Sequence, residues 1–257
     1  MLKVTPVRAF SDNYIWLIHG PRSPGHVAIV DPGDPIPVMK QLDQAGLGAA
    51  AILLTHHHPD HVGGVSRLAG ELELPVYGPA AEQIPMCEVP LSGGDHVRLE
   101  TLGLEFRIID CPGHTAGHIA YLGHGALFCG DTLFSAGCGR LFEGTPLQMS
   151  ESLARLASLP DDTRVFCTHE YTLSNLRFAA AVEPDNRDIA EYMDRATALR
   201  DADEPTLPST IGLEKRVNPF LRCHTAAVRE AAEKHVGRKL PDPVQVFAEV
   251  RAWKDRF

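Results

Sequence analysis

The sequence is short of long apolar runs and of positive charge. No stretch among its 257 residues approaches the roughly 20 apolar residues of a membrane span, and the first residues lack the apolar core of a secretory signal. The 24 Lys and Arg are outnumbered by 33 Asp and Glu, giving a net charge of −9. We therefore expect a cytoplasmic protein that binds neither nucleic acid nor an anionic membrane. Any positive patch for an anionic ligand must be local.

Cysteine is also scarce, and no two of the six cysteines form a Cys-x-x-Cys pair. Cys111, Cys129 and Cys167 end or follow apolar stretches, where a thiol could act as a nucleophile or as a soft metal ligand. A free cysteine is more often a small buried hydrophobe, which is the interpretation we favour here. Without a secretion signal, the thiols are expected to be reduced.

The most informative segment that is present reads Thr-His-His-His-Pro-Asp-His at 55–61, directly after the apolar run 49–54. Its candidate ligands are spaced as His56-x-His58-x-Asp60-His61, and imidazole and carboxylate both bind divalent ions. If a strand continued through this segment, His56 and His58 would face the same side. Asp60 and His61 would then fall in the turn beyond. Four ligands are more than one open catalytic zinc site takes from protein, so the spacing favours two metal ions.

The same pattern occurs three more times. Apolar stretches at 104–110, 126–129 and 164–167 are each followed by one candidate ligand, namely His114, Asp131 and His169. Each stretch is typical of a buried strand that delivers one ligand to the loop at its C-terminal end. A surface histidine cluster would not require this repetition, so the motifs together predict a metal site.

The chain changes character near residue 173. Before it, strands are expected at 14–18, 27–30 and 50–54, a helix at 36–45 and a turn at 93–95. After it, helices are expected at 175–182, 189–200, 226–235 and 243–254, and prolines separate them. We therefore predict an α/β domain at 1–173 and a helical domain at 174–257.

Four short motifs carry the candidate ligands: His-x-His-x-Asp-His, Pro-Gly-His-Thr-x-Gly-His, Cys-Gly-Asp-Thr and Thr-His-Glu-Tyr. Together they resemble the metallo-β-lactamase superfamily. Further segments at 12–16, 29–34, 137–144, 218–222 and 251–257 extend the resemblance over the whole chain. The last three resemble glyoxalase II, the hydroxyacylglutathione hydrolase family, more than its relatives.

This resemblance implies a metallo-β-lactamase-like αββα four-layer sandwich followed by a small helical C-terminal domain that binds the glutathione substrate. The implied activity is hydrolysis of S-(2-hydroxyacyl)glutathione thioesters, such as S-D-lactoylglutathione to D-lactate and glutathione in methylglyoxal detoxification. One metal would be held by His56, His58 and His114, and the other by Asp60, His61 and His169. Asp131 would bridge both ions together with a hydroxide, so Asp60 and Asp131 are the expected catalytic carboxylates. Two zinc ions per chain are expected, with iron or manganese as alternatives.

Substrate recognition has a separate signature at the C-terminus. Arg251 and Lys254 are three residues apart on the last expected helix, so their charged ends can converge, although cations near a helix C-terminus need no ligand to explain them. The resemblance assigns both, with Arg140 and Tyr171, to the glycine end of glutathione. Arg140 and Phe142 stand where animal and plant members have lysine and tyrosine. Arginine can still pair with a carboxylate, whereas Phe142 cannot donate a hydrogen bond.

Four neighbouring polar residues stay outside the predicted ligand set. His57 alternates away from its neighbours on a strand, and His118 is expected to orient another group. Asp31 is either a support for a ligand histidine or a turn residue, and the sequence does not choose between them. Glu170 is expected to support the site or to face solvent.

Three other functions are compatible with parts of this pattern. The first is another enzyme of the same scaffold: a persulfide dioxygenase, a lactonase or a β-lactamase. The second is a nucleic-acid hydrolase, which the acidic charge disfavours, and the third is a scaffold that has lost catalysis, which the complete ligand set disfavours. We expect a monomer whose partner is a small-molecule glutathione thioester.

Overall fold

The computed structural model describes residues 2–257, and the chain divides into two compact units. The first unit comprises the chain up to Cys111 together with Ala116–Gly130. The second comprises Pro112–Thr115 and Asp131–Phe257. The short insertion Pro112–Thr115 means that the candidate ligand His114 belongs to the second unit, although the chain on both sides of it belongs to the first.

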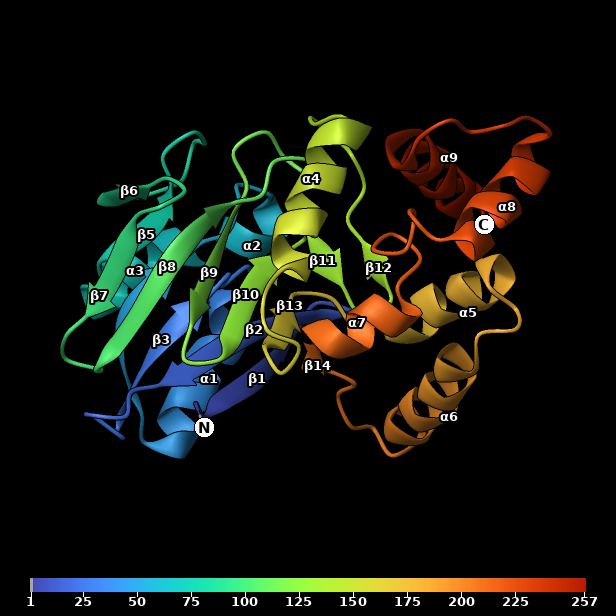
Figure 1. Ribbon diagram of the computed structural model, residues 1–257. Helices are drawn as coiled ribbons and strands as arrows, with labels where there is room; N and C mark the ends of the chain where they lie inside the picture. The colour runs from blue at the N-terminus through green and yellow to red at the C-terminus, as the bar shows by residue number, and fades with distance from the viewer. Residues whose placement is uncertain (1) are drawn as a thin grey trace. The chain divides into compact units, whose positions relative to one another are not determined.

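The first unit contains a sheet with the strand order β1-β2-β3-β4-β5-β6 (Figure 1). These strands are β1 (Val4–Ala9), β2 (Asn13–His19), β3 (His26–Val30), β4 (Gly48–Leu53), β5 (Val76–Pro79) and β6 (Val89–Leu91). The first three pair antiparallel, and β3 to β6 pair parallel. In β3 all residues after His26 are buried and apolar, a continuous run that is typical of a parallel strand.

Three helices follow strands of this sheet: α1 (Pro35–Ala45), α2 (Pro59–Val62) and α3 (Val65–Leu72). The Asp34 side chain accepts a hydrogen bond from the backbone N–H of Ile36 and so caps α1, which ends at Gly46 in the left-handed conformation. Val38 of α1 and Leu68 of α3 are fully buried in one apolar cluster with residues of the sheet. The loop that follows β3 therefore runs between two fixed elements, the end of the strand and the start of α1.

The first unit also contains an antiparallel meander in the order β10-β9-β8-β7. Its strands are β7 (His96–Leu99), β8 (Leu104–Asp110), β9 (Ile119–Gly123) and β10 (Ala126–Gly130). His124 and Gly125, both at positive φ, form the two-residue turn between β9 and β10. The buried hydroxyl of Tyr121 donates to the carbonyl oxygen of Leu54 at 2.9 Å. This hydrogen bond connects β9 to Leu54, the residue directly before the His-rich segment 55–61.

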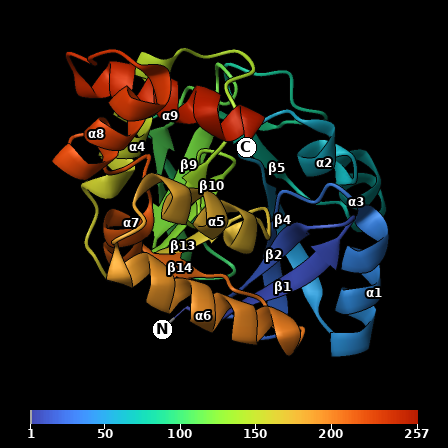
Figure 2. The same ribbon diagram turned by 90° about the vertical axis from the view of Figure 1, so that its right-hand side faces the viewer.

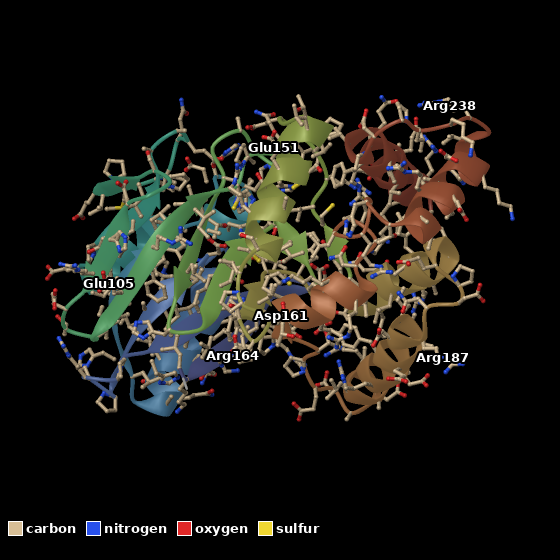
Figure 3. The ribbon with its side chains drawn as sticks, viewed as in Figure 1. Glu105, Glu151, Asp161, Arg164, Arg187 and Arg238 are labelled. Carbon is tan, nitrogen blue, oxygen red and sulfur yellow. The ribbon has the colours of Figure 1, made fainter. Side chains whose placement is uncertain are left out.

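The second unit is mainly helical. Its elements are β11 (Leu133–Phe134), β12 (Gly137–Cys138), α4 (Pro146–Ala157), β13 (Arg164–Cys167), α5 (Thr172–Val182), α6 (Arg187–Asp201), β14 (Ser209–Thr210), α7 (Ile211–Val217), α8 (Ala226–Val236) and α9 (Pro243–Arg256). Figure 2 shows α6 alongside α5, and Leu176 and Tyr192 from these two helices share one apolar cluster. Glu151 on α4, Arg187 on α6 and Arg238 in the connection between α8 and α9 are exposed (Figure 3), as charged side chains usually are.

Most of the predicted elements are confirmed within a few residues. The strands expected at 14–18, 27–30, 104–110, 126–129 and 164–167 and the five expected helices are all present. Helices α3, α4 and α7 were not predicted from the sequence. Among residues 2–257, no helix has the length and apolar composition needed to cross a membrane.

Candidate functional site

The His-rich segment is not a continuation of β4. The strand ends at Leu53, and the chain then passes through an irregular connection before α2 begins at Pro59. The expectation that strand alternation aligns His56 with His58 is therefore wrong. Asp60 and His61 lie on the short helix α2 instead of in an open turn. Proline at the first helical position starts this helix, because its φ angle is already helical and it has no N–H to satisfy.

Close backbone packing holds this segment in place. A Cβ atom added to Gly33 would lie 1.8 Å from the carbonyl oxygen of Asp60. Only glycine allows the loop after β3 to approach α2 so closely. The loop that carries Asp31 and the helix that carries Asp60 are consequently in contact.

The four candidate ligands of the first unit point their ring nitrogens and carboxylate at one another. His56 Nε2 lies 3.1 Å from His58 Nδ1, and His61 Nε2 lies 3.6 Å from Asp60 Oδ2. His56 and His61 are fully buried, with ring centroids 4.0 Å apart. Two ligands of a tetrahedral zinc ion are separated by about 3.3 Å when each metal–nitrogen bond is about 2.0–2.1 Å. The donor atoms therefore fit a divalent metal ion.

Asp31 sets the orientation of the two buried histidines. Its carboxylate accepts hydrogen bonds from the backbone N–H and the hydroxyl of Thr55, both at 2.8 Å, and Oδ2 lies 3.1 Å from His61 Nδ1. The Thr55 hydroxyl oxygen in turn lies 3.1 Å from His56 Nδ1. With Nδ1 of each ring engaged, Nε2 is left for a metal. The structure thus settles the role of Asp31, which the sequence left open.

His57 and His118 have other partners. His57 Nδ1 lies 2.8 Å from Glu82 Oε2, and Glu82 Oε1 accepts from the backbone N–H of Gly117 at 3.1 Å. The ring of His118 stacks on that of His56 at a centroid distance of 4.7 Å. His57 therefore ties the His-rich segment to the 79–88 loop, and His118 packs behind a candidate ligand.

The second unit brings the other three candidate ligands together. Asp131 Oδ2 lies 3.4 Å from His114 Nε2 and 3.3 Å from His169 Nε2. All three are nearly buried, with exposed fractions between 3% and 6%. The carbonyl oxygen of Arg140 lies 2.9 Å from His114 Nδ1, which leaves Nε2 directed at Asp131. One carboxylate oxygen between two imidazoles again fits the separations of metal ligands.

A cavity of about 570 Å³ in the second unit contains the predicted substrate residues. Its wall includes His114 and Asp131 together with all four of them: Arg140, Tyr171, Arg251 and Lys254. The phenol ring of Tyr171 stacks on the imidazole of His169 at 4.7 Å with an angle of 5° between the planes. Candidate metal ligands and candidate anion-binding cations therefore face one cavity.

The three cations of this cavity differ in how firmly they are held. The Arg251 side chain is almost fully buried, donates to the carbonyl oxygen of Cys138 at 2.8 Å and contacts Asp255 at 3.2 Å. Lys254 is half-buried and donates to Ser174, and burial, followed by the nearby Arg251 charge, lowers the pKa of its ammonium group. Arg140 is mostly exposed. Lys254 and Arg140 are therefore the more accessible cations.

Asp255 is a cavity residue that the sequence analysis missed. Its Oδ1 atom lies 3.2 Å from Arg251 Nη2 and 3.5 Å from Arg140 Nε. The sequence offered one signal for this residue: Asp255 lies four residues after Arg251, so the two side chains share one face of the last helix. A single carboxylate oxygen thereby holds two of the three guanidinium and ammonium groups in one place.

Comparison with known proteins identifies the family. A model described as "Metallo-beta-lactamase superfamily" matches residues 9–169, and one described as "Hydroxyacylglutathione hydrolase C-terminus" matches residues 170–257. A hydroxyacylglutathione hydrolase of Nitrosomonas eutropha is 53% identical over 257 residues, covering both chains completely. One of Pseudomonas fluorescens is 54% identical over 258 residues, again with complete coverage. The chain belongs to the hydroxyacylglutathione hydrolase family.

Solved structures agree with this family assignment at the level of the fold. ETHE1 from Myxococcus xanthus is 25% identical with a TM-score of 0.65, covering 99% of this chain and 98% of that one. A structure of TTHA1623 in a di-iron-bound form is 30% identical with a TM-score of 0.60, covering 84% and 100%. The predicted metallo-β-lactamase-like fold with a helical C-terminal region is confirmed, as expected for hydroxyacylglutathione hydrolases. Family members are metal-dependent hydrolases, which agrees with the histidine and aspartate donors described above.

Phe142 lines the cavity, whereas Glu170 lies outside it. Phe142 is 63% exposed, and its ring meets that of His114 edge-on at 5.3 Å. It provides an apolar edge beside a candidate ligand. The carboxylate of Glu170 accepts hydrogen bonds from the backbone N–H and the hydroxyl of Thr206 at 2.9 and 2.6 Å. Glu170 thus fastens the segment after His169 to the 205–210 loop.

The six cysteines are free, and five of them are buried, which agrees with the prediction that they are small buried hydrophobic residues. Burial raises the pKa of the Cys138 thiol to about 11 and those of Cys167 and Cys223 further still. At pH 8 these thiols carry almost no reactive thiolate. We expect a thiol-alkylating reagent to modify Cys87 alone in the native protein, because only Cys87 is half-exposed.

Peptide mass spectrometry after short alkylation, with and without denaturant, measures this prediction. Cys87→Ser should leave the native protein unlabelled. Rapid labelling of Cys167 in native protein would contradict the buried, unreactive assignment.

Proposed function

We propose that this protein hydrolyses S-(2-hydroxyacyl)glutathione thioesters, with S-D-lactoylglutathione giving D-lactate and glutathione. One observation carries the proposal: a single cavity in the second unit is lined by candidate metal ligands and by three cations. The full-length similarity to hydroxyacylglutathione hydrolases supports it. A glutathione thioester carries its glycine carboxylate at a distance from the scissile carbonyl, and the cavity offers cations for the carboxylate and candidate metal ligands near the carbonyl.

Two divalent metal ions, most simply zinc, are proposed as the cofactors, with iron or manganese as alternatives. The proposed ligands of one ion are His56, His58 and His114, those of the other are Asp60, His61 and His169, and Asp131 serves both. When bound, such ions polarise a carbonyl oxygen and make water acidic enough to react near neutral pH. The support is the donor chemistry in each unit and the near-tetrahedral separations between donor atoms.

The chain itself orients the proposed metal ligands. Asp31 and Thr55 hold His56 and His61 with Nε2 outward, and the amide of Asn13 donates to Asp60 Oδ2 at 3.0 Å. Asp60 and Asp131 are the proposed catalytic carboxylates. A thioester suits this site because its leaving thiolate is stable near neutral pH and needs no obligatory proton donor.

The glycine carboxylate of glutathione is proposed to pair with Arg140, Arg251 and Lys254, and Tyr171 is proposed to contact the same end of the substrate. Arginine offers paired N–H donors to a carboxylate, whereas lysine acts as a point charge. The remaining expectations stay proposals: a catalytic domain at 1–173, a glutathione-binding domain at 174–257, a cytoplasmic monomer, and no nucleic-acid or membrane partner.

Incubation of the purified protein with S-D-lactoylglutathione tests the function directly. Loss of thioester absorbance with release of one free thiol per thioester cleaved is the expected result, alongside elemental analysis for bound metal. Oxygen consumption with glutathione persulfide in place of thioester cleavage would favour the persulfide dioxygenase alternative. Cleavage of a β-lactam or a lactone at higher kcat/KM would favour the other enzymes of this scaffold.

Metal removal is expected to destabilise the fold. Binding to ligands that lie on separate loops stabilises only the folded chain, so the bound metal adds to its free energy of unfolding. The chelated protein should melt at a lower temperature than the metal-loaded protein, as measured by calorimetry with metal content confirmed. Readdition of zinc should restore the melting temperature, and identical curves for both forms would contradict the prediction.

A further inference from the structure

The short hairpin between the candidate ligand Asp131 and the candidate substrate residue Arg140 is held by polar side chains of the C-terminal helices. The hairpin is formed by β11 and β12, and its turn contains Ala136 at φ 53°. Such a conformation is unfavourable for a residue with a Cβ and persists only where surrounding contacts impose it. Contacts from neighbouring side chains must therefore hold this turn in place.

Glu214 of α7 provides the central contacts. Its side chain is fully buried, and its carboxylate accepts from the backbone N–H of Ala136 at 2.8 Å and from the hydroxyl of Ser135 at 3.2 Å. The amide of Asn218 donates to the same carboxylate at 3.1 Å. Burial raises the pKa of Glu214, and the hydrogen bonds from these donors oppose that rise. A buried carboxylate of this kind is costly unless its donors stay in place.

Three more side chains complete the network around the hairpin. The Asn218 amide also donates to the carbonyl oxygens of Phe134 and Gly137, at 3.2 and 2.9 Å. The Asn175 amide donates to the carbonyl oxygen of Ser135 at 3.0 Å, and the Tyr192 hydroxyl lies 2.7 Å from the Ser135 hydroxyl. Helices α5, α6 and α7 thus each supply at least one side chain that contacts the hairpin. The hairpin has little freedom to shift while this network is intact.

The position of the hairpin determines the geometry of the cavity. Asp131 lies two residues before it, and Arg140 lies two residues after it. The carbonyl oxygen of Cys138, on β12, accepts from buried Arg251, and the carbonyl oxygen of Arg140 lies against His114 Nδ1. A displacement of the turn would therefore move a metal-ligand candidate and two substrate-binding candidates together.

We propose that Glu214 is a positioning residue for both the metal and the substrate, acting through the β11–β12 hairpin. This inference rests on the proposed function, because it concerns the same cavity. Glu214→Gln keeps the size of the side chain but places an amide N–H₂ where one of the donors now points. The metal affinity and the substrate affinity are expected to fall together.

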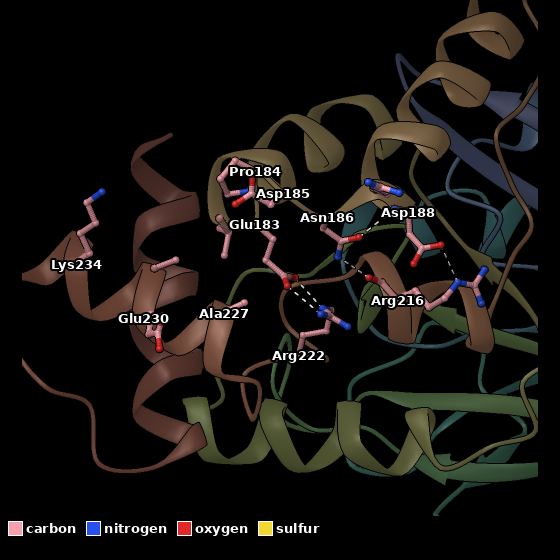
Figure 4. Close-up of a pocket in the computed structure, with 13 residues that line it drawn as sticks. Glu183, Pro184, Asp185, Asn186, Asp188, Arg216, Arg222, Ala227, Glu230 and Lys234 are labelled. Carbon is pink, nitrogen blue, oxygen red and sulfur yellow. Dashed lines mark hydrogen bonds and ion pairs between the residues drawn. The ribbon is translucent and has the colours of Figure 1, made fainter.

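The matched control is Glu183→Gln. Glu183 is also a buried acid of the second unit, but its carboxylate pairs with Arg222 at 2.7 and 2.9 Å (Figure 4) and not with the hairpin. Both variants should melt at lower temperature than the wild type. At a temperature well below both transitions, only Glu214→Gln should weaken zinc binding in a chelator competition. It should also raise KM for S-D-lactoylglutathione, each change being roughly tenfold or more.

Ser135→Ala is the second variant, for the case that Glu214→Gln does not fold. It removes one donor to Glu214 and should change zinc affinity and KM in the same direction by a smaller factor. Unchanged zinc affinity and KM in a folded Glu214→Gln protein, or equal changes in Glu183→Gln, would overturn the inference. Zinc binding is measured without substrate, so a wild type that binds zinc but cleaves no thioester would refute the proposed function alone.

Discussion

Asp131→Ala is expected to lower metal content and thioester hydrolysis together. Asp131 Oδ2 lies between the Nε2 atoms of His114 and His169, so its removal takes a ligand from each of the two proposed ions. Even the loss of a group that only supports a metal ligand typically costs ten- to a hundredfold in activity or metal affinity. We therefore expect kcat/KM to fall by roughly a hundredfold or more. Elemental analysis and steady-state kinetics on one preparation measure both effects.

Asp161→Ala is the control for this experiment, since Asp161 is an exposed acid of the same unit that pairs with Lys215. It should retain both metal ions and full activity. If Asp131→Ala kept two metals per chain and lost only activity, Asp131 would not be a bridging ligand. A fully active wild type with a single metal would contradict the dinuclear site itself.

Lys254→Ala is expected to raise KM for S-D-lactoylglutathione much more than it lowers kcat. The glutathione carboxylates do not change during hydrolysis, so contacts to them stabilise the ground state and the transition state about equally. A charge-assisted hydrogen bond contributes about 1.5–3 kcal/mol, or one to two powers of ten in affinity. The effect should lie near the lower end because Lys254 is only half-buried.

A small thioester without the glutathione carboxylates is the control substrate, and Lys254→Ala should hydrolyse it normally. Arg256→Ala, at an exposed position of the same helix, is the control variant. Arg251→Ala should weaken glutathione thioester use to a similar extent and should also lower the melting temperature, because its guanidinium is buried against Cys138 and Phe220. Equal losses on both substrates would mean that α9 supports the fold without contacting glutathione.

The lowered pKa of Lys254 adds a pH dependence to this prediction. An ammonium group with a lowered pKa loses its charge at a lower pH than an ordinary lysine, so KM for the glutathione thioester should begin to rise correspondingly early on the alkaline side. Lys254→Arg, which stays protonated, should remove that rise. An unchanged profile in Lys254→Arg would show that another group titrates.

The sequence was most informative where a motif depends on short-range chemistry. The apolar runs before His114, Asp131 and His169 predicted buried strands. Such a run is visible in the sequence without knowledge of the strands with which it pairs. A helix of the C-terminal region was predicted from a different pattern, in which apolar residues are spaced three or four apart. Capping residues such as Thr145 and Thr210, each of which accepts from a backbone N–H three residues on, could also have located α4 and α7.

The prediction for His56 and His58 failed because it assumed that β4 continued. Where a strand ends depends on its hydrogen-bonded neighbours, and β4 pairs with β5 only through Ile52 and Leu53. The backbone N–H of Leu54 still donates to the carbonyl oxygen of Tyr77 at 2.9 Å, but the strand itself ends at Leu53, and the chain then turns toward α2. The roles of Asp31 and Asp255 could not be predicted either, because they depend on contacts with residues far away in the sequence. Asp31 contacts Thr55 and His61, which lie 24 or more residues later in the chain. Asp255 on α9 contacts Arg140, which follows β12.

The amino-acid sequence was enough to name the candidate ligands, to locate most of the strands and helices, and to recognise the resemblance to the hydroxyacylglutathione hydrolase family. These follow from residue types and their spacing within a few turns or strands. The three-dimensional structure was needed to show which ring nitrogens of His56, His61 and His114 are available, that Arg251 is buried while Lys254 is half-buried, and that Glu214 hydrogen-bonds to the hairpin between Asp131 and Arg140. Such facts depend on contacts between residues far apart in the chain, because hydrogen-bond partners and burial are properties of the packed fold.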